Sequence, residues 1–180
     1  MLSIQCKGLT RLIVEFKNYP RTIEEKTREL VERLMQAGYD VADAGFKNAV
    51  YAGTNDVYVW KPFWDGNRMV LQATSDKGVV AFIEFGAGTY YEGYPDPVMQ
   101  ANSGAVGRGQ YGGKHGENPP WVYVGDPGNA GFVKAEKKSG KRKGQLVVET
   151  MGNPPARAMY NASKKFDLEE VVAMAREVFK

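Results

Sequence analysis

The sequence predicts an α+β domain, in which an antiparallel β-meander packs against one long N-terminal helix and against C-terminal helices. Three features predict this class. Residues 20–46 repeat apolar side chains near the 3.6-residue helical period. Residues 56–85 form short apolar or alternating runs between turn residues. Residues 86–144 are rich in glycine and proline, which predicts a long loop or hairpin arm. Because 180 residues with 43% hydrophobic content suffice for one core, we expect a single domain, 1–180, with 86–144 inserted in it.

The N-terminal part is expected to contain a strand and two helices. Residues 2–7 alternate apolar and polar side chains and predict an opening strand. Residues 9–16 predict a short helix, separated at 18–20 from the longest helix, because proline is well tolerated in a first helical turn. The apolar face of the long helix, which predicts packing of one side on a sheet, consists of Ile23, Leu30, Leu34, Val41 and Phe46.

The meander is predicted from three short segments and their turns. Residues 56–61 alternate as a half-buried strand, and the turn Asp65-Gly66-Asn67 joins them to a partner strand at 68–74. The run VVAFIEF at 79–85 is predicted as the third, buried strand. It is short, rich in β-branched and aromatic residues, and bounded by glycines.

Two further strands and two helices are expected toward the C-terminus. Residues 121–124 and 145–150 predict the strands. A helix is expected from Asn153 through Phe166, with Ala158, Met159, Ala162 and Phe166 facing inward. Asp167 and Glu170 resemble a capping box that begins the last helix. The residues that this helix is expected to bury are Leu168, Val171, Val172, Ala175, Val178 and Phe179.

Composition excludes few classes of protein, but it does bear on the cellular compartment and on the expected partners. The net charge of +3 is too small to indicate nucleic-acid binding by itself. The single cysteine, Cys6, excludes an internal disulfide and is expected to act as a small buried hydrophobe. Because neither a signal-peptide pattern nor an apolar run of about 20 residues occurs, we expect a protein that is made and kept in the cytoplasm, with no membrane partner.

The sequence offers little catalytic chemistry. The only histidine, His115, lies in a glycine-rich stretch away from other metal-ligating residues, so neither a metal nor a cofactor is expected. Glu84, between apolar neighbours, has two interpretations. It is either a general acid or, as we favour because no second carboxylate is paired with it, a residue on the wet face of the sheet or against a partner subunit.

One concentrated basic segment lies inside the long loop. Such a run either neutralises phosphates in a salt-dependent manner or forms a solvated hairpin tip. Both interpretations stay open at this point. The segment comprises Lys134, Lys137, Lys138, Lys141, Arg142 and Lys143.

Two short motifs, in this order around the long loop, resemble those of a known family. The first is FIEFGAG at 82–88, and the second is PPARAMYNA at 154–162. With the order of predicted elements, they resemble the tail-component, head–tail joining proteins of long-tailed, lambda-like bacteriophages. Ala87 stands where threonine is usual, and Ala158 where proline is usual. The residues that the resemblance marks as motif and assembly positions are Glu84, Phe85, Gly86, Gly88, Pro155 and Arg157.

The resemblance implies a structural virion protein without catalysis, which forms a ring at the neck and completes the tail or joins it to the head. Its implied partners are further copies of itself in a six-fold ring and the neighbouring neck and tail proteins. As a hypothesis, residues 137–143 touch the packaged DNA without reading its sequence. The alternatives are a nucleic-acid-binding module that uses 134–143 and, third, a small enzyme that uses Glu84.

Overall fold

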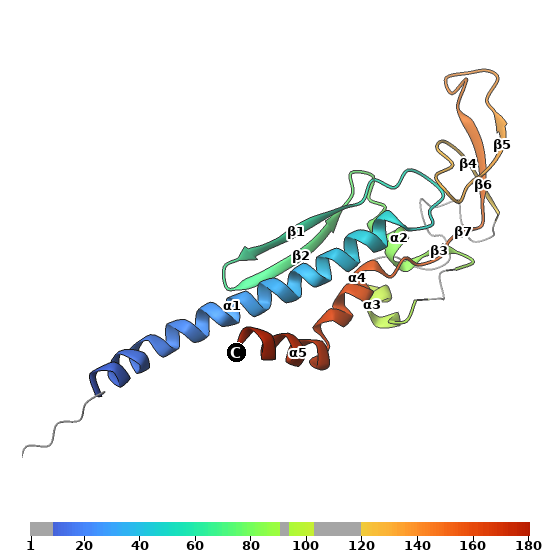
Figure 1. The fold of residues 1–180 in the computed structure, drawn as a ribbon. Helices are drawn as coiled ribbons and strands as arrows, with labels where there is room; N and C mark the ends of the chain where they lie inside the picture. Colours follow the sequence, from blue (N-terminus) through green and yellow to red (C-terminus); the bar gives the residue numbers. More distant parts are fainter. Residues whose placement is uncertain (1–8, 91–93, 103–119) are drawn as a thin grey trace, which may run out of the picture.

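The computed structural model describes residues 9–90, 94–102 and 120–180, and it confirms an α+β fold (Figure 1). One helix, α1 (Leu9–Lys47), runs along most of the molecule. A hairpin of β1 (Tyr58–Asp65) and β2 (Arg68–Thr74) packs along one side of it. The helices α4 (Ala158–Ser163) and α5 (Leu168–Val178) pack along the other side. The hairpin and the C-terminal helices therefore form two layers on opposite sides of α1.

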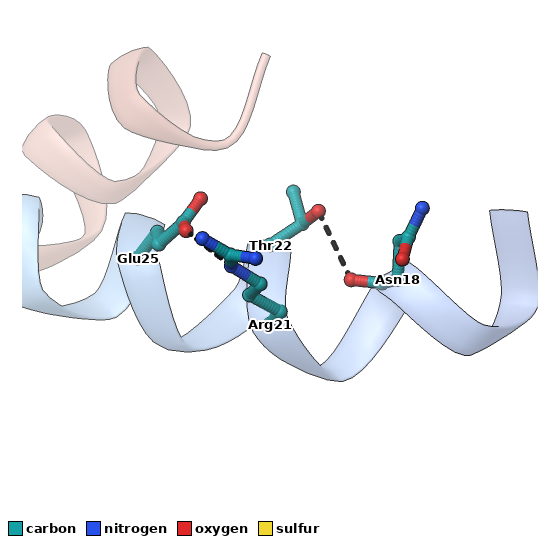
Figure 2. Close-up of polar contacts among 4 residues, drawn as sticks. All are labelled: Asn18, Arg21, Thr22 and Glu25. Carbon is teal, nitrogen blue, oxygen red and sulfur yellow. Dashed lines mark hydrogen bonds and ion pairs between the residues drawn. The ribbon is translucent and has the colours of Figure 1, made fainter.

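The expectation of two helices before residue 47 was wrong, because α1 continues through Pro20. Proline removes one helical hydrogen bond and crowds the preceding turn, but its fixed φ is compatible with a helix. Polar contacts bridge the turns around it. The Thr22 hydroxyl donates to the Asn18 carbonyl at 3.2 Å, and the Arg21 guanidinium pairs with Glu25 at 3.0 Å (Figure 2). The predicted strand at 2–7 lies outside the described residues.

The predicted third strand was also wrong. Residues 80–85 form a short helix, α2 (Val80–Phe85), which the Ile83 amide helps to close by donating to the Val79 carbonyl at 3.0 Å. The antiparallel meander therefore has two strands in its hairpin instead of three. An apolar run of this length fits a buried helix as well as a buried strand, because burial on all sides removes the periodicity that separates them.

The hairpin at 65–68 was predicted correctly. Tyr58 pairs with Thr74 and Asp65 with Arg68, and Gly66 occupies the turn with φ 65°. The register shifts between Trp60 and Phe63, where Pro62 cannot donate to the ladder.

The predicted hairpin arm is a three-stranded antiparallel sheet of order β4-β6-β5. Its strands are β4 (Trp121–Val124), β5 (Phe132–Glu136) and β6 (Leu146–Thr150). Both predicted strands are confirmed, whereas β5 was not predicted. The arm extends away from the helices near the C-terminal end of α1 (Figure 1). There the Asn129 side chain accepts from the Tyr51 amide at 2.7 Å and donates to the Ala49 carbonyl at 2.9 Å.

The remaining short elements lie between the hairpin and the arm or after it. They are β3 (Ala87–Gly88), α3 (Pro97–Asn102), β7 (Gly152–Asn153) and a single turn of 3-10 helix at Lys164–Phe166. The helix expected over 153–166 therefore begins five residues later, at Ala158.

The last helix begins near the predicted residue but without the predicted cap and with much of its apolar face exposed. Asp167 precedes α5, and its side chain makes no capping hydrogen bond within the described residues. Val178 is buried as expected, whereas Leu168 is 77% exposed and Phe179, Val172 and Phe166 are also exposed. Within the described residues, α5 packs mainly against α1 and the 3-10 turn, and Leu168 and Val172 remain exposed.

The core lies where α1, α2, β1 and α4 meet. Its fully buried members include Ala42, Phe46, Ile83, Ala158 and Ala162. Small residues allow α1 and α4 to approach closely. A β-carbon added at Gly45 would lie 2.7 Å from the Ala158 β-carbon. This separation is well below a normal van der Waals contact, so Gly45 is required by the approach of the two helices.

We predict that Gly45→Val destabilises the fold by about 1–3 kcal/mol, because the added methyl groups force α4 away from α1. Ala44→Val is the matched control. Ala44 is the preceding residue of α1 and is exposed, so we expect its cost to stay below about 1 kcal/mol. Urea unfolding followed by circular dichroism measures both changes. Equal stability of the two variants would contradict the close packing.

Candidate functional site

The two sequence motifs, about seventy residues apart, meet in one buried junction. The helix α2 and the strand β3 carry the first motif, and β7 and the start of α4 carry the second. Ala87 pairs with Asn153 and Gly88 with Gly152, which joins β3 to β7. The Ala156 amide donates to the Ile83 carbonyl at 2.8 Å, so the main chains stay joined on the approach to α4.

The Glu84 carboxylate lies at the centre of this junction and is 2% exposed. One oxygen, Oε1, accepts from the Tyr94 hydroxyl at 2.9 Å and from the Tyr160 amide at 3.0 Å. The other, Oε2, accepts from the Met159 amide at 3.0 Å. The carboxylate of α2 therefore accepts amides of the first turn of α4, a role that a residue just before a helix usually performs.

The favoured interpretation of Glu84, on the wet face of a sheet or against a partner subunit, was wrong. Glu84 lies on a helix, so it does not face the wet side of a sheet, and its side chain is buried within its own chain. Its two oxygens already receive three hydrogen bonds from groups of the fold. This arrangement is that of a structural acceptor, in which a negative charge at the start of a helix is also favourable.

Two glycines of the first motif are required by close contacts of the main chain. Gly86 has φ 79°, and an added β-carbon would lie 2.9 Å from the Pro155 ring. Gly88 has φ 67°, and an added β-carbon would lie 2.3 Å from the Met151 carbonyl oxygen. Positive φ and lack of space together exclude other residues. Gly86 and Pro155, from different motifs, thus form one contact.

Arg157 has an uncommon backbone conformation at the start of α4. Its φ of 54° makes it the one non-glycine residue with positive φ in the described part of the chain. Its amide donates to the Glu84 carbonyl at 3.2 Å. A left-handed conformation costs about 1–2 kcal/mol in a residue with a side chain. The surrounding hydrogen bonds hold it in this conformation and turn the chain into α4.

Aromatic side chains enclose the junction. Tyr94 packs edge-on against Phe85 at 4.6 Å and against Tyr160 at 5.8 Å between ring centroids. Burial raises the pKa of the Tyr94 hydroxyl well above its ordinary value, and the Glu84 charge raises it further. Tyr94 and Tyr160 were not predicted as site residues. The contact that involves them depends on tertiary packing, and the Tyr-Pro-Asp-Pro sequence at 94–97 indicated only a loop.

The predicted basic segment lies at the free end of the arm. Lys134, on β5, pairs with Glu149 of β6 at 2.9 Å. The remaining five basic residues follow on the connection between β5 and β6, and all are exposed. None of these five forms an ion pair with another described residue. Arg142 also borders a hollow of about 550 Å³, whose wall includes Trp121 and Tyr123 of β4.

Other classes of site find no support in the described residues. No group of three or more histidine, cysteine, aspartate or glutamate side chains is placed to hold a metal ion within residues 9–90, 94–102 and 120–180. In the same ranges, no helix combines the length and hydropathy that crossing a membrane requires.

Comparison of the chain with protein-family models, with curated proteins and with solved structures found no match.

We predict that Glu84→Gln destabilises the fold by about 1–3 kcal/mol, because an amide has one acceptor oxygen and leaves a buried donor unsatisfied. Glu170→Gln is the matched control, since Glu170 is exposed and pairs with Lys165 at 3.1 Å, and its loss should cost less than about 1 kcal/mol. Chemical unfolding of both variants measures the difference. A Glu84→Gln protein as stable as the parent would contradict the role of this carboxylate.

The raised pKa of Tyr94 predicts a loss of stability at alkaline pH. Above about pH 10 the unfolded chain releases the tyrosine proton while the folded chain retains it, so the free energy of unfolding falls as pH rises. Tyr94→Phe should make this fall shallower. Unfolding curves at a series of alkaline pH values measure the slope, and an unchanged slope in the variant would contradict the buried Tyr94–Glu84 contact.

Proposed function

We propose that this protein is a structural virion protein of a long-tailed bacteriophage that forms a ring at the neck. In that position it completes the tail or joins the tail to the head, without catalysis. The observation that carries the proposal is the junction of the two motifs. Residues that separately carry the resemblance, Glu84 and Gly86 in one motif and Pro155 and Arg157 in the other, contact each other.

The shape of the chain supports assembly. The helix α1 and the arm extend in different directions from the core (Figure 1). The exposed apolar side chains lie on several elements, including β1, the arm and α5. Exposed apolar surfaces of this kind are typical of proteins that bind other proteins. When two different surfaces of one chain bind each other, copies associate head to tail, and the arrangement closes into a ring if the rotation permits.

Quantitative mass spectrometry of density-purified tailed particles tests the proposal. We expect this chain at a handful of copies per particle, when it is scaled against the major capsid and tail-tube proteins. Absence from the particles, with abundant protein in the lysate, would contradict the virion assignment.

A second candidate function, a nucleic-acid-binding module, is favoured by the exposed basic segment at the arm tip. Five cationic side chains within residues 137–143, with no described acidic partner, suit contacts to phosphates. This function predicts that the isolated protein binds duplex DNA. It also predicts an affinity that falls steeply with salt and weakens when Lys137 and Lys141 are replaced by glutamine.

Fluorescence anisotropy with labelled duplex DNA at several salt concentrations separates the two functions. The ring proposal predicts weak binding or none by the isolated chain. Strong salt-dependent binding, combined with absence from particles, would favour the nucleic-acid-binding module.

A further inference from the structure

We propose that the free edge of β4, with the hollow beside it, binds an extended acidic segment of another protein, which adds a strand to the sheet of the arm. The partner to which this inference commits is a peptide segment in extended conformation that carries a carboxylate. The inference goes beyond the proposed ring, and it does not depend on the chain being a virion protein.

The strand β4 has one free edge among the described residues, because in the sheet of order β4-β6-β5 it pairs on one side with β6. The Gly125 amide donates to the Leu146 carbonyl at 3.0 Å, one step beyond the pair Val124–Val147. Hydrogen-bonded and non-hydrogen-bonded pairs alternate in an antiparallel ladder, so the amides and carbonyls of Val122 and Val124 point away from β6. No described main-chain group pairs with them. Such unpaired edge groups are a template for an added strand.

The hollow of about 550 Å³ lies along this edge. Its wall includes all four residues of β4, although successive side chains of a strand point to opposite faces of the sheet. A space that borders four consecutive residues therefore lies beside the edge of the strand, not over one face. The aromatic rings in its wall belong to Tyr51, Phe82, Trp121 and Tyr123. A hollow of this size and character is typical of a ligand-binding cleft.

One polar group in the hollow lacks a partner. The Trp121 indole N–H is buried and makes no hydrogen bond. Other side chains in the wall have acceptors: the Asn153 amide donates to the Phe82 carbonyl at 2.9 Å, and the Tyr123 hydroxyl donates to the Asp126 carbonyl at 2.8 Å. Because buried donors in folded proteins are nearly always satisfied, the indole indicates an acceptor on a bound segment.

The charge in the hollow is positive. Among the described residues of its wall, Arg142 is the only one with a charged side chain, and it forms no ion pair with a described residue. Lys141 and Lys143 flank it on the same exposed connection, which leads into β6 beside the end of β4. A guanidinium binds a carboxylate through two parallel hydrogen bonds. The hollow therefore suits a segment with an acidic side chain at this end of β4.

A segment of another protein fits these groups better than a nucleic acid or a second copy. A peptide main chain has N–H and C=O groups at the strand spacing that the edge of β4 requires, whereas a nucleic acid does not. A second copy is a poor source. In the described strands that have a free edge, the carboxylates are Asp65, which pairs with Arg68, and Glu136, which adjoins the basic segment.

NMR titration of the full-length, isotope-labelled chain with synthetic peptides tests the inference. The probes are short acetylated and amidated peptides that alternate valine and threonine and carry one glutamate at the first, central or last position. We expect saturable shifts of the Val122 and Val124 amides with at least one peptide. Replacement of its glutamate by glutamine should weaken binding about tenfold, because a charge-assisted hydrogen bond is lost. N-methylation of its amides, which removes the main-chain donors, should abolish binding.

A matched pair of variants locates the carboxylate contact. Arg142→Gln should weaken the glutamate peptide about tenfold and leave the glutamine peptide unchanged. Lys141→Gln is the control, because Lys141 lies on the same exposed connection but outside the wall of the hollow, and it should leave both affinities unchanged. Equal effects of the two substitutions would indicate attraction by the whole basic segment and would overturn the assigned contact.

The same titration distinguishes the other occupants. Absence of saturable shifts with every peptide, or undiminished binding by the N-methylated peptide, overturns the inference. A mixed-sequence single-stranded oligonucleotide that shifts the Val122 and Val124 amides in place of the peptides also overturns it. Shifts of these amides when the chain alone is concentrated would identify a second copy as the occupant, with the same consequence.

The outcome is separable from that of the proposed function, because the titration uses the isolated chain. Failure of the peptides to bind leaves the ring proposal intact, and absence of the chain from particles leaves the peptide result intact.

Discussion

A buried carboxylate joins the two halves of this chain. Glu84 belongs to α2, in the first half of the sequence, yet its oxygens accept two amides in the first turn of α4 and the hydroxyl of Tyr94. A buried charge is costly unless hydrogen bonds compensate it, and here three donors do so. Removal of the whole carboxylate would leave those donors unpaired. The start of α4 therefore depends on a residue more than seventy positions earlier.

Much of the architecture follows from this constraint. The main chain on either side of the carboxylate is joined by β3 and β7, where glycines permit an approach that a side chain would block. β7 follows directly after β6, the central strand of the arm, and α4 packs against α1 at Gly45. One junction thus anchors both the base of the arm and the C-terminal helices to α1.

The sequence predicted those elements whose signals are local. The hairpin turn at Gly66, the strands predicted at 121–124 and 145–150 and the burial of Phe46 all follow from turn chemistry or periodicity. The errors arose where tertiary contacts decide which secondary structure a segment adopts. The apolar run at 80–85 is a helix enclosed by other elements, and Pro20 lies within a continuous helix. The motifs identified Glu84 and Arg157, but nothing local indicated that Tyr94 would donate to the carboxylate.

The central claim is that copies of this chain form a ring at the neck of a tailed particle. Cryo-electron microscopy of that neck tests it most directly. We predict a ring whose repeating unit accommodates the 39-residue helix α1 and, at one end of it, the three-stranded arm. If every ring between head and tail is fully accounted for by other chains, the claim is wrong.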